Sequence, residues 1–452
     1  MKPVLLIDFG STYTKATAVD VEGECLLGTA QSGTTVGEDI SIGLERALAE
    51  LKAQTGISEF SERYACSSAA GGLRIVASGL VPSLTAEAAK RAALGAGAKV
   101  VKTFAYTLTD EDIAELDAIQ PEIMLLCGGT DGGNKDCAIA NCQALTQVKA
   151  DFPVILACNR AATAECRQIL EASGREVIPC ENVMPVFNRL NIAPAQAVIR
   201  EVFLRRIIKA KGLSKAQSLL SGILMPTPAA VMTALSLLSK SIGELMAVDL
   251  GGATTDVYSI SKGLPTHPGT VLRGLPEPYE KRTVEGDIGM RYGAPGIVEA
   301  AGMARISEIS GQDEAFIEAY LASFQSAPDH LAANDAERSV DFALATLAIE
   351  TGLIRHAGTL EEVFTPMGVA YQQTGKDLTD TTKLILTGGA LIRMGKAPEM
   401  AKLAMRSMAV PNSLMPRKAE PALDRDYILS AMGLLSQKYP QIASNLLIKE
   451  FC

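Results

Sequence analysis

Residues 247–256 decide the fold; they read Ala247-Val248-Asp249-Leu250-Gly251-Gly252-Ala253-Thr254-Thr255-Asp256. An apolar run at 245–248 leads into Asp249, and a second apolar run, at 257–260, follows the segment that is rich in Gly and Thr. Two runs of β-type residues joined by a short polar, glycine-rich segment are typical of a β-hairpin. We therefore predict a hairpin with Asp249 near the end of its first strand.

The same pattern occurs at the start of the chain, in Asp8-Phe9-Gly10-Ser11-Thr12-Tyr13-Thr14-Lys15. Apolar runs at 4–7 and 16–19 flank this segment, and Thr14 stands six residues after Asp8, as Thr255 does after Asp249. Chance explains one Asp-x-Gly sequence, whereas two in the same strand–turn–strand context indicate a duplicated structural motif. A plain β-turn with a capping Asp is the alternative for each hairpin.

A tight turn with few side chains exposes backbone N–H groups, which anionic oxygens can approach closely, and nearby hydroxyls add donors. An Asp at the strand end supplies an oxygen ligand for Mg²⁺, directly or through water that the ion keeps. We therefore predict that one hairpin from each of two lobes grips the triphosphate of a nucleotide. Lys15 either reaches a phosphate or points to solvent, and Asp256, at the corresponding place, either assists Mg²⁺ or is structural.

Thr387-Gly388-Gly389-Ala390 follows an apolar run at 383–386 and is a third candidate element. Paired glycines let the backbone lie flat against a planar adenine and its ribose. An ordinary strand-to-helix turn is the alternative, because many such turns contain Gly-Gly. The order hairpin, hairpin, strand with Gly-Gly is what favours a nucleotide site.

Composition limits the class of protein. The 452 residues suit two or three domains, and 48% hydrophobic with 21% charged residues is typical of a globular chain. A net charge of −9 and an aromatic content of 5% without Trp argue against nucleic acid as a partner. No segment has the roughly 20 apolar residues of a membrane span, and Asp8 interrupts any signal-peptide core.

The nine cysteines are scattered without a CxxC spacing, and the three histidines lie far apart in the sequence. This pattern gives no local zinc signature. We expect reduced, mostly buried thiols in a cytoplasmic protein, because a free Cys commonly behaves as a small buried hydrophobe.

Residues 121–185 alternate strands and helices, which predicts a parallel sheet in an inserted α/β subdomain. The expected division is a first lobe at 1–120, the insertion at 121–190, a helical connection at 191–240 and a second lobe at 241–452.

Within the second lobe we expect an exposed loop region at 263–296, which is rich in Gly and Pro, and mainly helices through 297–371. The glycine-rich segment 128–133 is either a ligand or partner surface or a tightly packed turn. It lacks the spacing of dinucleotide and Walker motifs.

The order of the three motifs resembles the phosphate-one, phosphate-two and adenosine motifs of the ATPase superfamily that contains actin, the heat-shock chaperone ATPases and the sugar and acetate kinases. Residues 84–97 are similar to the segment that precedes the interlobe helix there. Six stretches together resemble, over nearly the whole chain, the GlmL or MutL family, accessory proteins of adenosylcobalamin-dependent glutamate (methylaspartate) mutase. This family shares only a name with the mismatch-repair MutL. The stretches are 8–15, 66–73, 128–135, 181–185, 247–256 and 285–292.

The resemblance implies an α/β actin-like ATPase fold, with two ribonuclease-H-like lobes around a nucleotide cleft and an inserted α/β subdomain. It also implies a reactivating chaperone that uses ATP and Mg²⁺ to promote release of damaged cobalamin from a mutase, its partner. By motif position, Asp8 and Asp249 are expected to bind Mg²⁺ or its water shell and to orient the attacking water. The residues expected to bind ATP or ADP are Gly10, Ser11, Thr12, Tyr13, Lys15, Gly251, Gly252, Ala253, Thr254, Gly388, Gly389 and Ala390.

Two other functions stay open. A small-molecule kinase of the same superfamily would need a residue that deprotonates an acceptor, and no motif here identifies an acceptor pocket. A nucleotide-dependent scaffold would hold ATP and hardly hydrolyse it. The sequence also leaves open whether the target is glutamate mutase or a related aminomutase, and whether the chain forms a homo-oligomer or needs a small second subunit.

Overall fold

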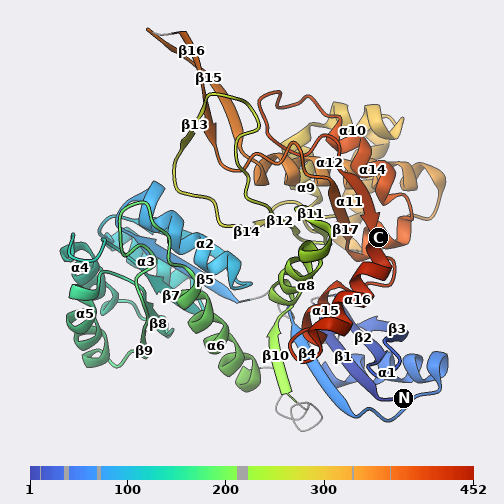
Figure 1. The fold of residues 1–452 in the computed structure, drawn as a ribbon, viewed down its shortest axis with the longest axis horizontal. Helices are drawn as coiled ribbons and strands as arrows, with labels where there is room; N and C mark the ends of the chain where they lie inside the picture. The colour runs from blue at the N-terminus through green and yellow to red at the C-terminus, as the bar shows by residue number, and fades with distance from the viewer. Residues whose placement is uncertain (11, 35–39, 69–72, 211–221, 328–329, 367) are drawn as a thin grey trace. The chain divides into compact units, whose positions relative to one another are not determined.

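The computed structural model describes residues 1–10, 12–34, 40–68, 73–210, 222–327, 330–366 and 368–452 (Figure 1). The chain forms two compact units. Unit 1 contains Met1–Thr233, Gly274–Pro276 and Ser430–Ala443, and unit 2 contains Ala234–Arg273, Glu277–Leu429 and Ser444–Cys452.

Unit 1 contains a five-stranded sheet that begins with the N-terminal hairpin. β1 (Pro3–Phe9), β2 (Tyr13–Asp20) and β3 (Cys25–Gly33) are antiparallel neighbours, while β4 (Glu62–Ser67) runs parallel to β1, and β10 (Gly222–Pro226) parallel to β4. The order is β10-β4-β1-β2-β3, and α1 (Ile40–Thr55) packs on β2 and β3. Leu5, Ile7 and Phe9 enter one buried core, as the period of two along a strand requires.

Unit 2 repeats this arrangement in the order β14-β12-β11-β17-β18. β11 (Leu245–Leu250), β12 (Thr255–Ile260) and β14 (Glu280–Glu285) are antiparallel, β17 (Lys383–Thr387) runs parallel to β11, and β18 (Glu420–Leu423) parallel to β17. The registers also agree, since Asp8 faces Lys15 and Asp249 faces Asp256. The duplicated hairpins are therefore the first two strands of two related sheets, which confirms the predicted α/β class with two ribonuclease-H-like lobes.

Unit 1 also contains an all-parallel sheet of order β6-β5-β7-β8-β9. Its strands are β5 (Arg74–Gly79), β6 (Lys99–Ala105), β7 (Ile123–Leu126), β8 (Val154–Leu156) and β9 (Val177–Pro179). Ile123 faces the core shared with the first sheet and Met124 faces a second core, so both faces are covered, as parallel sheets require. The boundaries of the insertion stay a proposal. If the whole parallel sheet belongs to the insertion, the insertion begins at Arg74 and not at residue 121.

Helices connect these parallel strands and lead out of them. They are η1 (Pro82–Ala86), α2 (Glu87–Gly95), α3 (Asp110–Ile119), α4 (Asp136–Leu145), α5 (Arg160–Ala172) and α6 (Ala193–Ala210). Most of the segment 84–97 thus lies in η1 and α2, which pack on β5 and β6. The helix that joins the two related sheets along the chain is α8 (Thr227–Ile242), between β10 and β11.

The core of unit 2 is organised by α12 (Asp335–His356), whose residues Val340, Leu344 and Leu347 are fully buried. The Asn334 side chain accepts the Glu337 N–H at its start, which satisfies a terminal donor. The other helices are α9 (Ala294–Ala301), α10 (Met303–Ser310), α11 (Glu314–Ser326), α13 (Gly389–Met394), α14 (Ala397–Met405), α15 (Leu429–Leu435) and α16 (Pro440–Phe451). Among the described helices, none is long and apolar enough to cross a bilayer.

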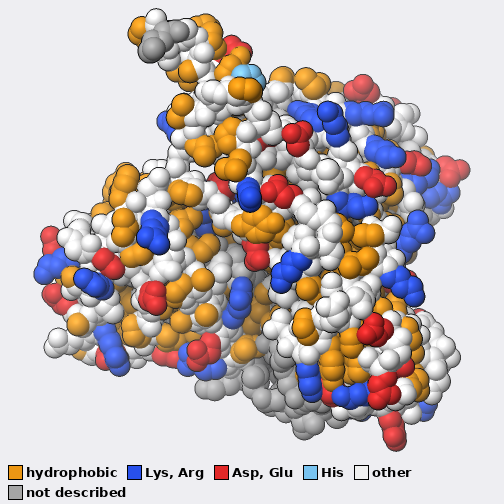
Figure 2. Space-filling view, in the orientation of Figure 1, with side chains coloured by type: hydrophobic (Ala, Val, Ile, Leu, Met, Phe, Trp, Pro, Cys, Tyr) orange, Lys and Arg blue, Asp and Glu red, His pale blue; other side chains and the backbone are white. Residues whose placement is uncertain are grey.

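Two expectations for unit 2 are wrong in part. Within 297–371, β15 (Thr359–Thr365) and β16 (Gly368–Thr374) form a hairpin, and 263–296 contains β13 (Thr270–Arg273) besides β14. β13 pairs with β16, and β14 with β12. Tertiary pairing, which local composition does not show, makes these segments strands. Apolar side chains gather at the hairpin tip, where Phe364 is 81% exposed (Figure 2).

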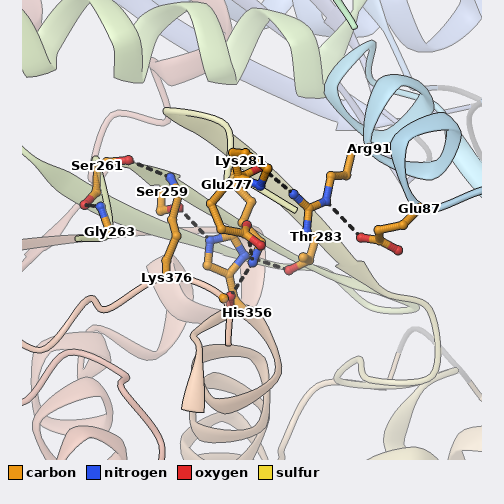
Figure 3. Close-up of polar contacts among 12 residues, drawn as sticks. Glu87, Arg91, Ser259, Ser261, Gly263, Glu277, Lys281, Thr283, His356 and Lys376 are labelled. Carbon is orange, nitrogen blue, oxygen red and sulfur yellow. Dashed lines mark hydrogen bonds and ion pairs between the residues drawn. The ribbon is translucent and has the colours of Figure 1, made fainter. Parts of the chain in front are cut away.

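A buried polar cluster fixes the base of this hairpin (Figure 3). Lys376, fully buried just after β16, donates to Ser259 Oγ (3.2 Å) and to two backbone carbonyls (2.8 Å each). His356 Nε2 lies 2.8 Å from Ser259 Oγ, and Nδ1 lies 2.8 Å from Thr283 Oγ1. Burial holds the pKa of His356 well below its usual value.

The nine cysteines are free thiols. Six of them are buried, and Cys452 is exposed. Burial is the first cause that raises the pKa of Cys66 well above its ordinary value, so this thiol is held neutral. The prediction that most of the cysteines are buried is therefore confirmed.

Candidate functional site

The first hairpin turn is closed by contacts within unit 1. The Gly10 N–H donates to the Tyr13 carbonyl (3.0 Å), the Thr34 hydroxyl to the Gly10 carbonyl (2.9 Å) and the Thr34 N–H to the Thr12 carbonyl (2.8 Å). A Cβ at Gly10 would lie 2.5 Å from the Tyr13 oxygen, so the turn excludes a side chain there. Ser11, predicted to bind phosphate, lies outside the described residues.

Asp8, at the end of β1, is 4% exposed and accepts hydrogen bonds on both oxygens. The Thr227 hydroxyl donates to Oδ1 (2.6 Å) and the Ser430 hydroxyl to Oδ2 (3.0 Å). Lys15 Nζ lies 3.3 Å from Oδ2. Lys15 therefore points to Asp8, its partner across the hairpin, and not simply to solvent. Cys66 packs beneath, with its Sγ 3.7 Å from Thr227 Oγ1.

The second turn has the same closure, in unit 2. The Gly251 N–H donates to the Thr254 carbonyl (2.9 Å), and a Cβ at Gly251 would lie 2.9 Å from that oxygen. The carbonyls of Gly251 and Gly252 accept the N–H groups of Met290 (3.0 Å) and Arg291 (2.8 Å). Because these carbonyls are bonded on one side, the peptide planes of the turn are fixed before any ligand arrives.

Glycines of the segment 285–292 and its continuation make this close approach feasible. A Cβ at Gly289 would lie 2.5 Å from the Ala253 carbonyl carbon, and one at Gly293 would lie 2.6 Å from the Ala253 oxygen. Any side chain there would push the segment off the turn. The segment 285–292 is therefore the support of the second turn, a role that the sequence pattern did not reveal.

Asp249 and Asp256 face each other across the second hairpin and differ in their surroundings. Arg282, 7% exposed, donates through Nε to Asp256 Oδ1 (2.7 Å). This ion pair favours the structural role for Asp256 over a role in binding Mg²⁺. Asp249 is half-buried at the end of β11, in the position that Asp8 has in β1.

The structure brings the Gly-Gly motif against the second hairpin. Gly388 has φ +109°, and a Cβ there would lie 2.3 Å from the Leu250 carbonyl oxygen. Thr387 pairs with Asp249 in the parallel register of β17 and β11. Gly389 begins α13, and a Cβ there would meet no atom within 4 Å. Gly388 is thus required by packing, while Gly389 presents open backbone beside it.

Asp424 lies next to this motif and is buried. Its carboxylate accepts from Thr387 Oγ1 (3.0 Å) and from the Ile428 N–H (2.8 Å). Burial outweighs these bonds and raises the pKa of Asp424 to about 6. The carboxyl therefore links β17 to the start of α15 and titrates near neutral pH.

The glycine-rich segment 128–133 is bonded within unit 1. The Asn182 amide donates to the Gly129 carbonyl and to Asp131 Oδ1 (3.0 Å each), and the Asn159 amide donates to the Gly133 carbonyl (3.0 Å). These contacts join two of the sequence signatures, 128–135 and 181–185. They favour the tightly packed turn over the ligand surface.

Sequence reasoning missed Thr227, Ser430, Arg282 and Asp424. Thr227 follows Pro226 at a helix start and Ser430 lies near the chain end, so nothing local connects either of them with Asp8. The Met-Pro-Thr-Pro break at 225–228 was the one available signal, because it marks a strand-to-helix junction. Asp8 lies in unit 1 and Asp249 lies in unit 2.

Comparison with known proteins gives matches over the whole length. The family model described as MutL protein matches residues 4–451. Protein MutL of Clostridium tetanomorphum is 44% identical over 457 residues, which are 99% of this chain and 99% of that protein.

Solved structures give weaker matches. Diol dehydratase-reactivating factor in its nucleotide-free form is 12% identical with TM-score 0.40, over 98% of this chain and 100% of that one. Component A of (R)-2-hydroxyglutaryl-CoA dehydratase from Acidaminococcus fermentans is 10% identical with TM-score 0.35, over 98% and 100%. At such TM-scores the likeness carries no conclusion about this chain.

Proposed function

Because this chain belongs to the MutL family, we propose that it binds and hydrolyses Mg²⁺-ATP and reactivates an adenosylcobalamin-dependent mutase by promoting release of damaged cobalamin. The target would be glutamate (methylaspartate) mutase or a related aminomutase. The observation that carries the nucleotide part is the duplicated hairpin, with Asp8 and Asp249 at matching positions and the same Gly-closed turn after each.

The turns fit phosphate groups. Gly10 and Gly251 carry no side chain, and their closing bonds fix short loops in which anionic oxygens can contact backbone N–H groups. The remaining proposed phosphate ligands are Thr12, Tyr13, Lys15, Gly252, Ala253 and Thr254. Gly388, Gly389 and Ala390 would face adenosine, for which the open backbone at Gly389 leaves room.

Mg²⁺ fits a site of this kind without a dedicated protein cage. Among the described residues, no group of three or more His, Cys, Asp or Glu side chains could hold a metal ion. Mg²⁺ usually takes one or two carboxylates together with phosphate oxygens and water, so Asp8 and Asp249 suffice as protein ligands, directly or through water. The ion would neutralise charge on the transferred phosphoryl group.

The chain's own residues would supply positioning. Little covalent chemistry is asked of a protein in phosphoryl transfer, so a carboxylate held in one orientation can align the attacking water. A two-state partner equilibrium moves from 1:99 to 99:1 with about 5.5 kcal/mol of differential affinity. Different contacts with ATP and with ADP would give the chain two states that differ in this way in their affinity for the mutase.

The proposal is tested by phosphate release from Mg²⁺-ATP, alone and with a cobalamin mutase inactivated by turnover, while mutase activity is followed in the same tube. We expect hydrolysis together with returning mutase activity. Asp8→Asn and Asp249→Asn should abolish both, and Asp380→Asn, an exposed carboxyl elsewhere in unit 2, should change neither.

Two results would contradict the reactivase. ATP binding without turnover or rescue would favour the scaffold, and phosphate appearing on a metabolite would favour the kinase. Unchanged turnover in both Asp→Asn variants would remove the hairpins from the proposed site.

A further inference from the structure

Asp8 is the point where two distant helices are tied to the first hairpin. Thr227 is the first residue of α8, and Ser430 is the second residue of α15. Their hydroxyls donate to different oxygens of this one buried carboxylate, at 2.6 and 3.0 Å. They lie 219 and 422 residues away from Asp8 in the sequence. The two bonds together hold the carboxylate plane in one orientation.

Both helices stand where the chain passes between the two units. The boundary after Thr233 falls inside α8, and the chain returns to unit 1 at Ser430, at the start of α15. At each of these two places where the chain passes between the units, a hydroxyl on the unit 1 side donates a hydrogen bond to Asp8. A change in the hydrogen bonds that Asp8 accepts would therefore directly affect the first residues of α8 and α15.

We propose that Thr227 and Ser430 are positioning residues that orient Asp8 and transmit its occupancy by Mg²⁺-nucleotide to α8 and α15. This inference rests on the proposed function, because it takes Asp8 to be a ligand of Mg²⁺ or of its water shell. A carboxylate has about four acceptor sites, and three donors already use Asp8. One acceptor site remains, so an ion or its water would bind an oxygen that already accepts a hydrogen bond, and its positive charge would weaken that bond. The hydrogen bonds at the helix starts therefore change when the site fills.

Because the two hydroxyls donate to different oxygens of Asp8, the coupling of Asp8 to α8 and its coupling to α15 can be tested separately. Thr227 acts on Oδ1, and Ser430 acts on Oδ2 together with Lys15. Removing one hydroxyl should therefore uncouple one helix and leave the other coupled. Hydrogen bonds to charged groups are strong enough that such a loss changes an equilibrium by about ten-fold or more.

The test is backbone hydrogen exchange of the full chain with and without Mg²⁺-ADP, alongside calorimetric binding of Mg²⁺-ADP. In the wild type, nucleotide should slow exchange in the first turns of α8 and α15. Thr227→Val should abolish the change in α8 alone, and Ser430→Ala the change in α15 alone, while Thr227→Ser restores the wild-type response. Matched controls are Thr233→Val and Ser436→Ala, whose hydroxyls bond to nearby helix carbonyls.

The outcomes separate this inference from the function beneath it. If wild-type protein binds no Mg²⁺-ADP, the proposed function and this inference both fail. If nucleotide binds and both variants keep the wild-type exchange response, the proposed nucleotide binding stands but the positioning role of Thr227 and Ser430 is refuted. An equal loss in both helices from either variant, or from the controls, also refutes it, because it would reflect general loosening.

Discussion

The buried carboxyl of Asp424 predicts an unusual pH dependence of stability, which Asp424→Asn should remove. Burial raises the pKa of Asp424 to about 6 from the ordinary 3.8. The folded state therefore holds this proton more tightly than the unfolded chain does. Its contribution to the free energy of unfolding is complete below pH 3.8 and is lost as the pH rises through about 6. A difference of about 2 pH units corresponds to about 3 kcal/mol.

The assay is urea unfolding of the wild type and Asp424→Asn at intervals between pH 4 and pH 7.5, followed by circular dichroism. The Asn variant keeps an acceptor for the Ile428 N–H and has no proton to lose. We expect the stability of the variant relative to the wild type to rise by about 2 kcal/mol over this range, which is most of the full effect, and then to level off. Asp380→Asn, at an exposed position, should give a flat difference.

Two parallel curves for the wild type and Asp424→Asn would refute the reasoning. They would mean that the Thr387 and Ile428 donors compensate the burial of the charge in full. A difference that shrinks as the pH rises would show that the folded state lowers the pKa of Asp424.

Three further predictions concern single sites. Glu62→Gln should lower the free energy of unfolding by about 2 kcal/mol at neutral pH, after allowance for solvent screening. Hydrogen bonds from Lys438, Tyr64, Tyr439 and Lys2 outweigh burial and lower the pKa of Glu62 to about 2, so this loss should disappear as the pH falls from 4.5 towards 2. Acid titration of the unfolding of both proteins checks this. Gly388→Ala should destabilise unit 2 through its clash with Leu250, whereas Gly389→Ala should keep the melting temperature and weaken ATP binding by calorimetry. Lys376→Met should cost about 3 kcal/mol in urea unfolding because three acceptors, two of them buried, lose their donor. Lys262→Met, at the surface, should cost less than about 0.5 kcal/mol.

The two hairpins were predictable because their information is local. Apolar runs with strand character flank Asp8 and Asp249, and the glycines that close each turn follow within two residues. The register in the structure pairs the residues as the repeated pattern suggested. The strand before Gly388 was also visible as a short apolar run, and the structure places it beside β11.

Other parts depend on contacts between distant residues. The bonds of Thr227 and Ser430 to Asp8 span 219 and 422 residues, and no local pattern carries such a pairing. Strand β14 contains four charged residues in six, so its sequence resembles a loop until β12 pairs with it. The need for glycine at Gly289 arises only because the second turn packs against it.

We propose that Asp8 and Asp249 both serve the binding of Mg²⁺-nucleotide, and equilibrium binding tests this proposal most directly. The measurement is calorimetric titration of the wild type, Asp8→Asn and Asp249→Asn with Mg²⁺-ATP and with Mg²⁺-ADP. We expect one site per chain in the wild type and a Kd at least about ten-fold higher in each variant, with both variants folded as judged by melting. Absence of binding in the wild type, or the same Kd in all three proteins, would contradict it.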